Sequence, residues 1–91
     1  MNQPQHVHYV EGKSDGAEAA LRTFMAGLSS LPGLLDACLL ASPAQPGLWL
    51  LESRWQGPVP ELSVPGGFKH WSFEVRASVA GSSPTSTGPE R

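Results

Sequence analysis

The sequence has a single cysteine, Cys38, among its 91 residues, and few charged side chains, which make up 15% of the chain. One cysteine excludes an internal disulfide framework and a zinc site built from several cysteines. The six basic residues are scattered, with no two adjacent, and the formal net charge is −2. Nucleic-acid binding requires a clustered basic surface, so we expect no nucleic-acid partner.

Long apolar runs are missing too. No run approaches the ~20 residues of a membrane-spanning helix, so we expect no membrane partner. The first residues, MNQPQHVHYVEG, have neither the basic start nor the apolar core of a secretory signal, which predicts a cytoplasmic location. The sequence also has no phosphate-binding loop, nucleophile elbow or glycine-rich dinucleotide motif, so it gives no sign of those chemistries.

Apolar residues are plentiful, at 40% of the chain, which is typical of a globular protein. A chain of this length forms one domain with a marginal core, because it buries only about 60–65% of its unfolded surface. Few charges on a small body leave much surface neutral or apolar, which favours an oligomer. We predict one domain over residues 1–80 and a disordered tail over residues 81–91, which are small and polar.

Apolar periodicity predicts one helix, over residues 16–29. Its apolar stripe consists of Ala17, Leu21, Phe24, Leu28 and Leu31. Pro32 and Gly33 end it. Prolines recur too closely in residues 56–67 for a second long helix to form there.

Alternating or continuous apolar patterns predict four strands, over residues 6–11, 34–41, 48–55 and 68–79. The last segment alternates most cleanly. It also fits a helix with one apolar side, formed by Phe68, Trp71, Val75 and Val79. We favour the strand and keep the helix as the alternative.

The segment 48–55 begins apolar on both faces, since Leu48 and Leu50 alternate with Trp49 and Leu51. A strand with one solvated face would alternate between apolar and polar residues. One helix can cover only one face of the sheet. A second copy of the chain is the simplest cover for the other, so we predict a homodimer that associates through the sheet face.

The element order is therefore β-α-β-β-(α)-β, an α+β arrangement of the ferredoxin-like kind with a shortened or missing second helix. Residues 7–55 resemble the antibiotic biosynthesis monooxygenase (ABM) superfamily. The likeness rests on a helix ending in Leu-Pro-Gly, the strand sequence LLDACLLAS, a short Pro/Gly loop and the sequence LWLLESRW. It weakens after Trp55, where the family continues with a helix and this chain has residues 56–67.

The resemblance implies a dimeric α+β barrel with a pocket between sheet and helices in each subunit. Some members of the superfamily are oxygenases that use no cofactor and act on quinol-like aromatic compounds. Related members degrade haem and use an asparagine of the first strand. This chain has no asparagine in residues 6–11, because its only one is Asn2, which argues against haem cleavage. We therefore expect no cofactor.

Trp55 matches the tryptophan that the family has at the end of this strand, and the resemblance implies that its ring stacks on a flat substrate. A core aromatic residue is the alternative. With Trp55, we expect Phe24, Trp71 and Phe73 to shape a substrate pocket. His70 is the candidate catalytic residue, because an imidazole handles protons near neutral pH. The alternative is an ordinary surface histidine.

His6 and His8 share one strand face, and with His70 they offer a possible metal site. Two exposed histidines near a terminus fit better, and we predict no metal. Cys38 lies in an apolar strand with no positive neighbour in sequence to lower its pKa, so we expect a buried, unreactive thiol.

Two functions remain open. The first is a cofactor-independent monooxygenase acting on a small aromatic substrate, a phenol or quinol. The alternative is a non-catalytic small-ligand binding or dimeric interaction module of the same fold. The absence of any paired acid and base in the sequence favours the alternative, whereas the resemblance to ABM oxygenases favours the enzyme.

Overall fold

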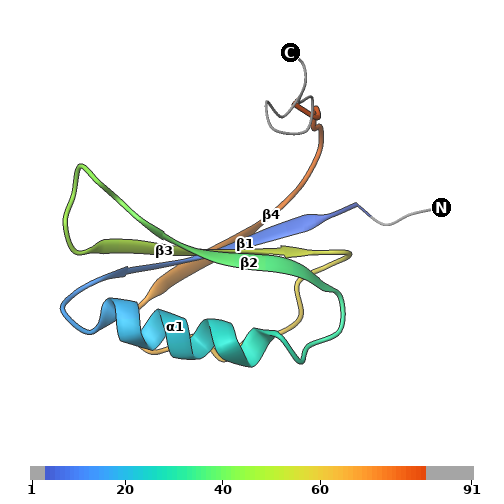
Figure 1. The fold of residues 1–91 in the computed structure, drawn as a ribbon. Coiled ribbons are helices and arrows are strands. Elements are labelled where there is room, and N and C mark those ends of the chain that lie inside the picture. Colours follow the sequence, from blue (N-terminus) through green and yellow to red (C-terminus); the bar gives the residue numbers. More distant parts are fainter. Residues whose placement is uncertain (1–3, 82–91) are drawn as a thin grey trace, which may run out of the picture.

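A computed structural model describes residues 4–81 of the chain as one sheet with a helix across one of its faces (Figure 1). The elements in chain order are β1 (His6–Lys13), α1 (Ala17–Leu28), β2 (Leu34–Ala41), β3 (Leu48–Trp55) and β4 (Lys69–Glu74). The protein is therefore a small α+β domain.

The sheet has four strands in the order β2-β3-β1-β4, and every neighbouring pair is antiparallel. The N-terminal strand thus lies in the interior of the sheet, between strands that come much later in the chain. In this register Val10 lies opposite Leu51 of β3 and His70 of β4. Residues directly opposite each other point to the same face, so the register decides which side chains meet.

The helix α1 lies over the face that carries His8 and Val10 of β1 (Figure 1). We call this the helix face and the opposite side the open face. The side of α1 that packs on the sheet buries Ala17, Leu21 and Leu28. Gly33 follows the helix with a φ of 90°, a left-handed conformation that glycine adopts without strain, and the chain then enters β2.

The core lies between α1 and the sheet. Its most buried side chains come from β1, α1 and β3 and are Val10, Leu21, Leu28, Leu51 and Trp55. The segment after β3 adds partly buried cover to the same core through Val59, Leu62, Val64 and Phe68. This segment therefore occupies part of the helix face that α1 leaves uncovered.

Gly12 shows how closely the segment packs. A Cβ atom added at Gly12 would lie 3.2 Å from the ring of Phe68 and 3.0 Å from the Cβ of Ala17. A larger residue at Gly12 would therefore push the helix start and the Phe68 ring a few tenths of an ångström away from β1.

The strand predicted over residues 68–79 is confirmed, and the helical alternative is wrong. The strand is shorter than predicted, because β4 ends at Glu74 and residues 75–81 have no regular structure. Val75 N–H still donates to the carbonyl oxygen of Gln5 at 2.8 Å, which continues the contact with the start of β1 by one residue. Residues 56–67 contain no helix, as their prolines predicted.

The predicted tail over residues 81–91 lies outside the described residues except for Gly81. Within residues 4–81, no helix is long and apolar enough to cross a membrane.

Replacing Leu51 with alanine should lower the free energy of unfolding by about 2–5 kcal/mol, because the side chain is 1% exposed and its loss leaves a cavity under α1. Urea denaturation measures the change. Leu35→Ala is the matched control, since Leu35 is 45% exposed and its truncation opens no cavity. Equal losses in the two variants would contradict the position of the core.

Candidate functional site

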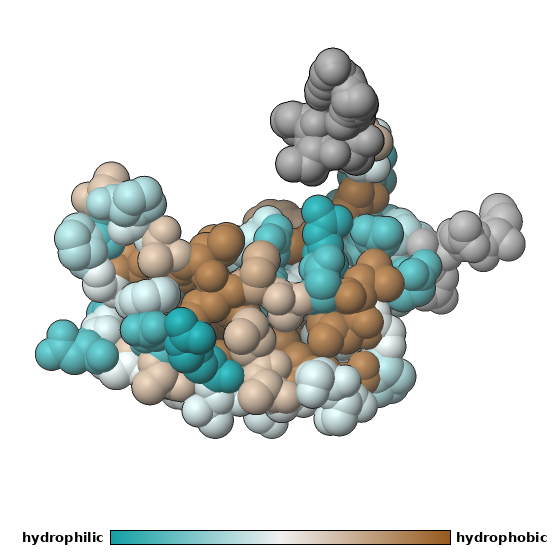
Figure 2. All heavy atoms as spheres, in the orientation of Figure 1, coloured by the Kyte–Doolittle hydropathy of each residue, from teal (hydrophilic) through white to brown (hydrophobic). Residues whose placement is uncertain are grey.

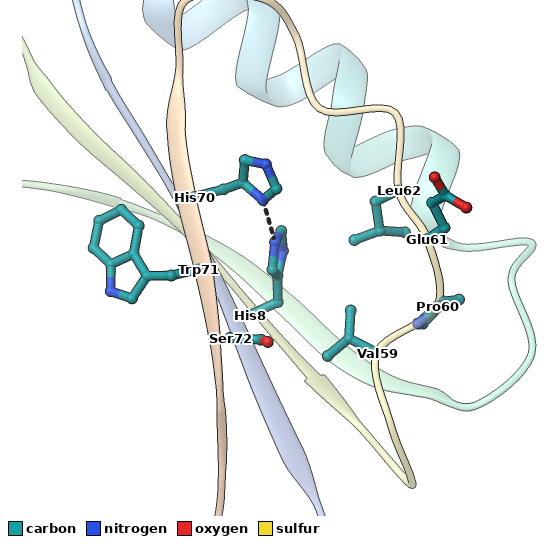
Figure 3. Close-up of a pocket in the computed structure, with 8 residues that line it drawn as sticks. All are labelled: His8, Val59, Pro60, Glu61, Leu62, His70, Trp71 and Ser72. Carbon is teal, nitrogen blue, oxygen red and sulfur yellow. Dashed lines mark hydrogen bonds between the residues drawn. The ribbon is translucent and has the colours of Figure 1, made fainter.

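Two histidines from different strands meet on the helix face. Nε2 of His8, in β1, lies 3.1 Å from Nδ1 of His70, in β4, and the two rings meet edge to face with centroids 5.2 Å apart (Figure 3). They are diagonal neighbours across the sheet, because His8 is opposite Ser72 and His70 is opposite Val10. The two residues are 62 positions apart in the sequence.

His8 is buried, with 5% of its surface exposed, so the prediction of an exposed histidine here is wrong. Burial lowers the pKa of its imidazole, and the nearby His70 lowers it further. Both effects favour the neutral imidazole, in which one ring nitrogen carries a proton and the other does not. Its Nδ1 is sealed from solvent and has no hydrogen-bond partner among residues 4–81.

A cleft of about 440 Å³ opens beside the pair. Its size falls within the range of small-molecule sites. Figure 3 shows the histidines on one side and the irregular chain after β3 on the other. The lining residues are His8, Val59, Pro60, Glu61, Leu62, His70, Trp71 and Ser72. The cleft thus joins an apolar wall to a pair of polar ring nitrogens.

Beneath the cleft, a buried hydrogen-bond chain holds β1 and β3 in register. The indole N–H of Trp55 donates to the hydroxyl oxygen of Ser53 at 2.9 Å, and the Ser53 hydroxyl donates to the carbonyl oxygen of His8 at 3.5 Å. Ser53 is 1% exposed and its hydroxyl is satisfied on both sides. This chain fixes the backbone that carries the His8 imidazole.

Trp55 itself is a core residue in this structure. It is 1% exposed, and its N–H is already bonded to Ser53. The ring has no face open to a ligand. The substrate-stacking role that the family resemblance implies for Trp55 would require the core to open.

The other predicted pocket residues do not line one common cavity. Phe24, on α1, lines a separate hollow of about 310 Å³ near the end of the helix. Trp71 borders the cleft, but its side chain points away from it, on the far side of β4 (Figure 3). Phe73 is 51% exposed, and its ring contacts Tyr9 edge to face at 5.9 Å. Of the predicted site residues, only His70 places its side chain beside the cleft.

The open face carries apolar side chains around a polar centre. Both oxygens of the Glu52 carboxylate are used, since Tyr9 O–H donates to one oxygen at 3.1 Å and Cys38 S–H to the other at 3.5 Å. Large exposed apolar residues of the sheet are Leu35, Leu40, Trp71 and Phe73. Figure 2, which has the orientation of Figure 1, views the sheet nearly edge-on and shows hydrophobic and hydrophilic residues side by side across this side of the molecule.

Cys38 is exposed on this face, so the prediction of a buried thiol is wrong. Partial desolvation raises the pKa of the Cys38 thiol, and the hydrogen bond to Glu52 raises it further. Both effects make the thiol harder to ionise, and its low reactivity stays a prediction.

Within the described residues, no three metal-binding side chains gather into one cluster. The ring of His6 points elsewhere, because its Nδ1 lies 3.2 Å from the carbonyl oxygen of Pro4.

No protein-family model, curated protein or solved structure matches this chain. Membership of the ABM superfamily therefore stays a prediction that rests on the sequence pattern.

The buried His8 predicts a pH-dependent stability. The pKa of His8 is lower in the folded chain than in the unfolded chain, so below about pH 6.5 the unfolded chain binds more protons at this imidazole. The free energy of unfolding should therefore fall as the pH is lowered. Thermal denaturation between about pH 7.5 and pH 5 measures the fall. His8→Gln should flatten this part of the profile.

His6→Gln is the matched control, since His6 lies two positions away on the same strand face and bonds only to Pro4. Its profile should follow that of the unmodified protein. A profile that is unchanged by His8→Gln would show that His8 is not the group that couples folding to pH.

Proposed function

We propose that this protein is a cofactor-independent monooxygenase of the ABM type, which binds a small phenol or quinol in the cleft beside His70. The observation that carries the proposal is the His8–His70 pair, whose ring nitrogens meet at 3.1 Å on the wall of a cleft of about 440 Å³. The strand order β2-β3-β1-β4 supports a ferredoxin-like fold, as this family has.

The apolar side of the cleft, with Val59 and Leu62, receives the aromatic ring. His70 lies across from it and forms a hydrogen bond to the phenol oxygen, which favours loss of the phenol proton. The electron-rich phenolate carbon then bonds to O2, and the peroxide loses water as its O–O bond breaks. For phenol itself, one molecule of phenol and one of O2 give one of para-benzoquinone and one of water, so the substrate supplies every electron and no cofactor is required.

The alternative is a non-catalytic binding or interaction module of the same fold. It is favoured by the separation of the predicted pocket aromatics, because Trp55 lies in the core, and Phe24 and Phe73 are not among the residues that line the cleft. The pocket wall is then made by aliphatic side chains of an irregular segment. Such a cleft binds an apolar ligand without any need for reaction.

We also propose a homodimer through the open face. Trp71 and Phe73 are 40% and 51% exposed there, and Leu40 is 41% exposed. A sheet whose second face carries large apolar side chains is stabilised when another surface removes them from water. A second copy of the same face supplies an apolar surface of the same kind, and the cytoplasmic location of such a dimer stays a prediction.

Oxygen consumption tests the enzyme. The unmodified protein should consume O2 with one or more members of a quinol panel, and His70→Phe should lower the rate by about 100-fold, because the ring that bonds the phenol oxygen is lost. His6→Gln serves as the control with an intact cleft. If no quinol supports uptake above the spontaneous rate, the protein is not an oxygenase of this kind.

Light scattering tests the dimer. We expect a mass twice the 9.7 kDa of the chain, and a single chain after Phe73→Glu, because two charges would then be buried at the contact. Val79→Glu places the same charge at a residue that is 94% exposed and beyond β4, and should leave the dimer intact. A mass of one chain for the unmodified protein at micromolar concentration would contradict the proposal.

A further inference from the structure

The two histidines share one hydrogen bond, and the direction of that bond decides what the cleft can recognise. In one arrangement His8 donates from Nε2 to Nδ1 of His70. In the other, His70 donates from Nδ1 to Nε2 of His8. Both satisfy the observed distance of 3.1 Å, but they leave opposite chemistry at the remaining nitrogens.

The buried Nδ1 of His8 distinguishes the two arrangements. If His70 were the donor, neutral His8 would carry its proton on Nδ1, as an N–H group sealed from solvent with no acceptor among residues 4–81. Buried N–H groups without partners are rare in folded proteins, and buried acceptors without partners are better tolerated. His8 therefore carries its proton on Nε2 and donates it to His70.

The direction of this hydrogen bond also determines the tautomer of His70. Its Nδ1 accepts the hydrogen bond from His8, so the proton of neutral His70 lies on Nε2. His70 is exposed at the cleft, and no described residue bonds its Nε2. The nitrogen that a ligand meets is therefore a hydrogen-bond donor.

We infer that His8 is a positioning residue that holds His70 as an Nε2–H donor, and that the cleft selects aromatic ligands bearing an oxyanion, such as a phenolate, over the same ring without one. The inference rests on the proposed function only in taking a phenol as the ligand. His70 promotes ionisation by stabilising the anion, and the proton leaves to water.

The apolar wall and the donor lie on opposite sides of the cleft, as Figure 3 shows for Val59 and Leu62 facing the histidines. A ring held against the wall can direct its oxygen toward His70. Glu61 also borders the cleft, but its carboxylate is turned away from the histidines (Figure 3), so it does not oppose an oxyanion placed at His70. The expected ligand is thus an apolar ring with one oxyanion.

Because the cleft lies on the helix face, a dimer formed through the open face would leave it complete within one chain. Binding therefore does not depend on the oligomeric state. A charge introduced at Phe73 should change the mass of the assembly and leave ligand affinity unaltered.

The test uses 4-nitrophenol, whose anion absorbs visible light, and 4-nitroanisole, which has the same ring and a methyl group on the oxygen. At pH 8 the unmodified protein should bind the anion at least about tenfold more tightly than the ether. His70→Phe should remove this preference. His70→Gln should retain part of it, because the glutamine amide reaches the position of Nε2 with an N–H donor.

His8→Phe should reduce the preference as well, since His70 then loses the group that fixes its tautomer. Nitrogen-15 NMR of the unmodified protein provides a readout that does not depend on this buried substitution. It should show protons on Nε2 of both histidines. A proton on Nδ1 of His8, or equal affinity for the anion and the ether, would overturn the inference.

The two proposals fail separately. Tight binding of 4-nitrophenolate without oxygen uptake on any quinol supports the anion site and removes the oxygenase. Oxygen uptake with no preference for the anion removes the role of His8 and leaves the oxygenase.

Discussion

The structure depends on the placement of β1 between β3 and β4. This strand is the first in the chain, yet it pairs on both sides with strands that follow much later. Its register sets Val10 against Leu51 in the core and brings His8 beside His70. A shift of one residue would turn His8 and Val10 to the open face and remove both the core contact and the histidine pair.

The cleft exists because the segment between β3 and β4 is irregular. Its prolines prevent a helix, so residues 56–67 cross the helix face as an extended chain. Side chains such as Val59 and Leu62 reach the core, but an irregular chain covers a sheet less completely than a second helix would. The space that remains lies over the two histidines and is the molecule's candidate site.

The two faces of the sheet carry different side chains, and our two proposals, a ligand site and a dimer contact, concern one face each. On the helix face, burial lowers the pKa of His8, and the hydrogen bonds of Trp55 and Ser53 tie its backbone to β3. On the open face, the Glu52 carboxylate accepts hydrogen bonds from Tyr9 and Cys38, and the exposed large apolar side chains lie on the outer strands β2 and β4. Glu52 shares this face with the exposed ion pair of Arg54 and Asp36, so the proposed second copy would have to accommodate these charges as well as cover the apolar side chains.

The sequence by itself determined the elements of the fold. Alternation and helical spacing are local properties, so they predicted α1, β2, β3 and the strand character of β4 without tertiary knowledge. They also showed that β3 is apolar on both sides, as Leu50 on the open face and Leu51 in the core illustrate. The spacing of the prolines in residues 56–67 likewise excluded a second long helix.

Only the tertiary structure decided which of the two alternating sets of side chains in each strand would face α1. Period two separates Cys38 from Leu39, but it does not say which of them α1 will cover, and Cys38 proved to be exposed. For the same reason the sequence wrongly predicted that His8 is exposed. No local pattern pairs it with a histidine 62 residues away. Strand pairing over such distances is set by the packing of the whole sheet, so the site emerges only when the chain is folded.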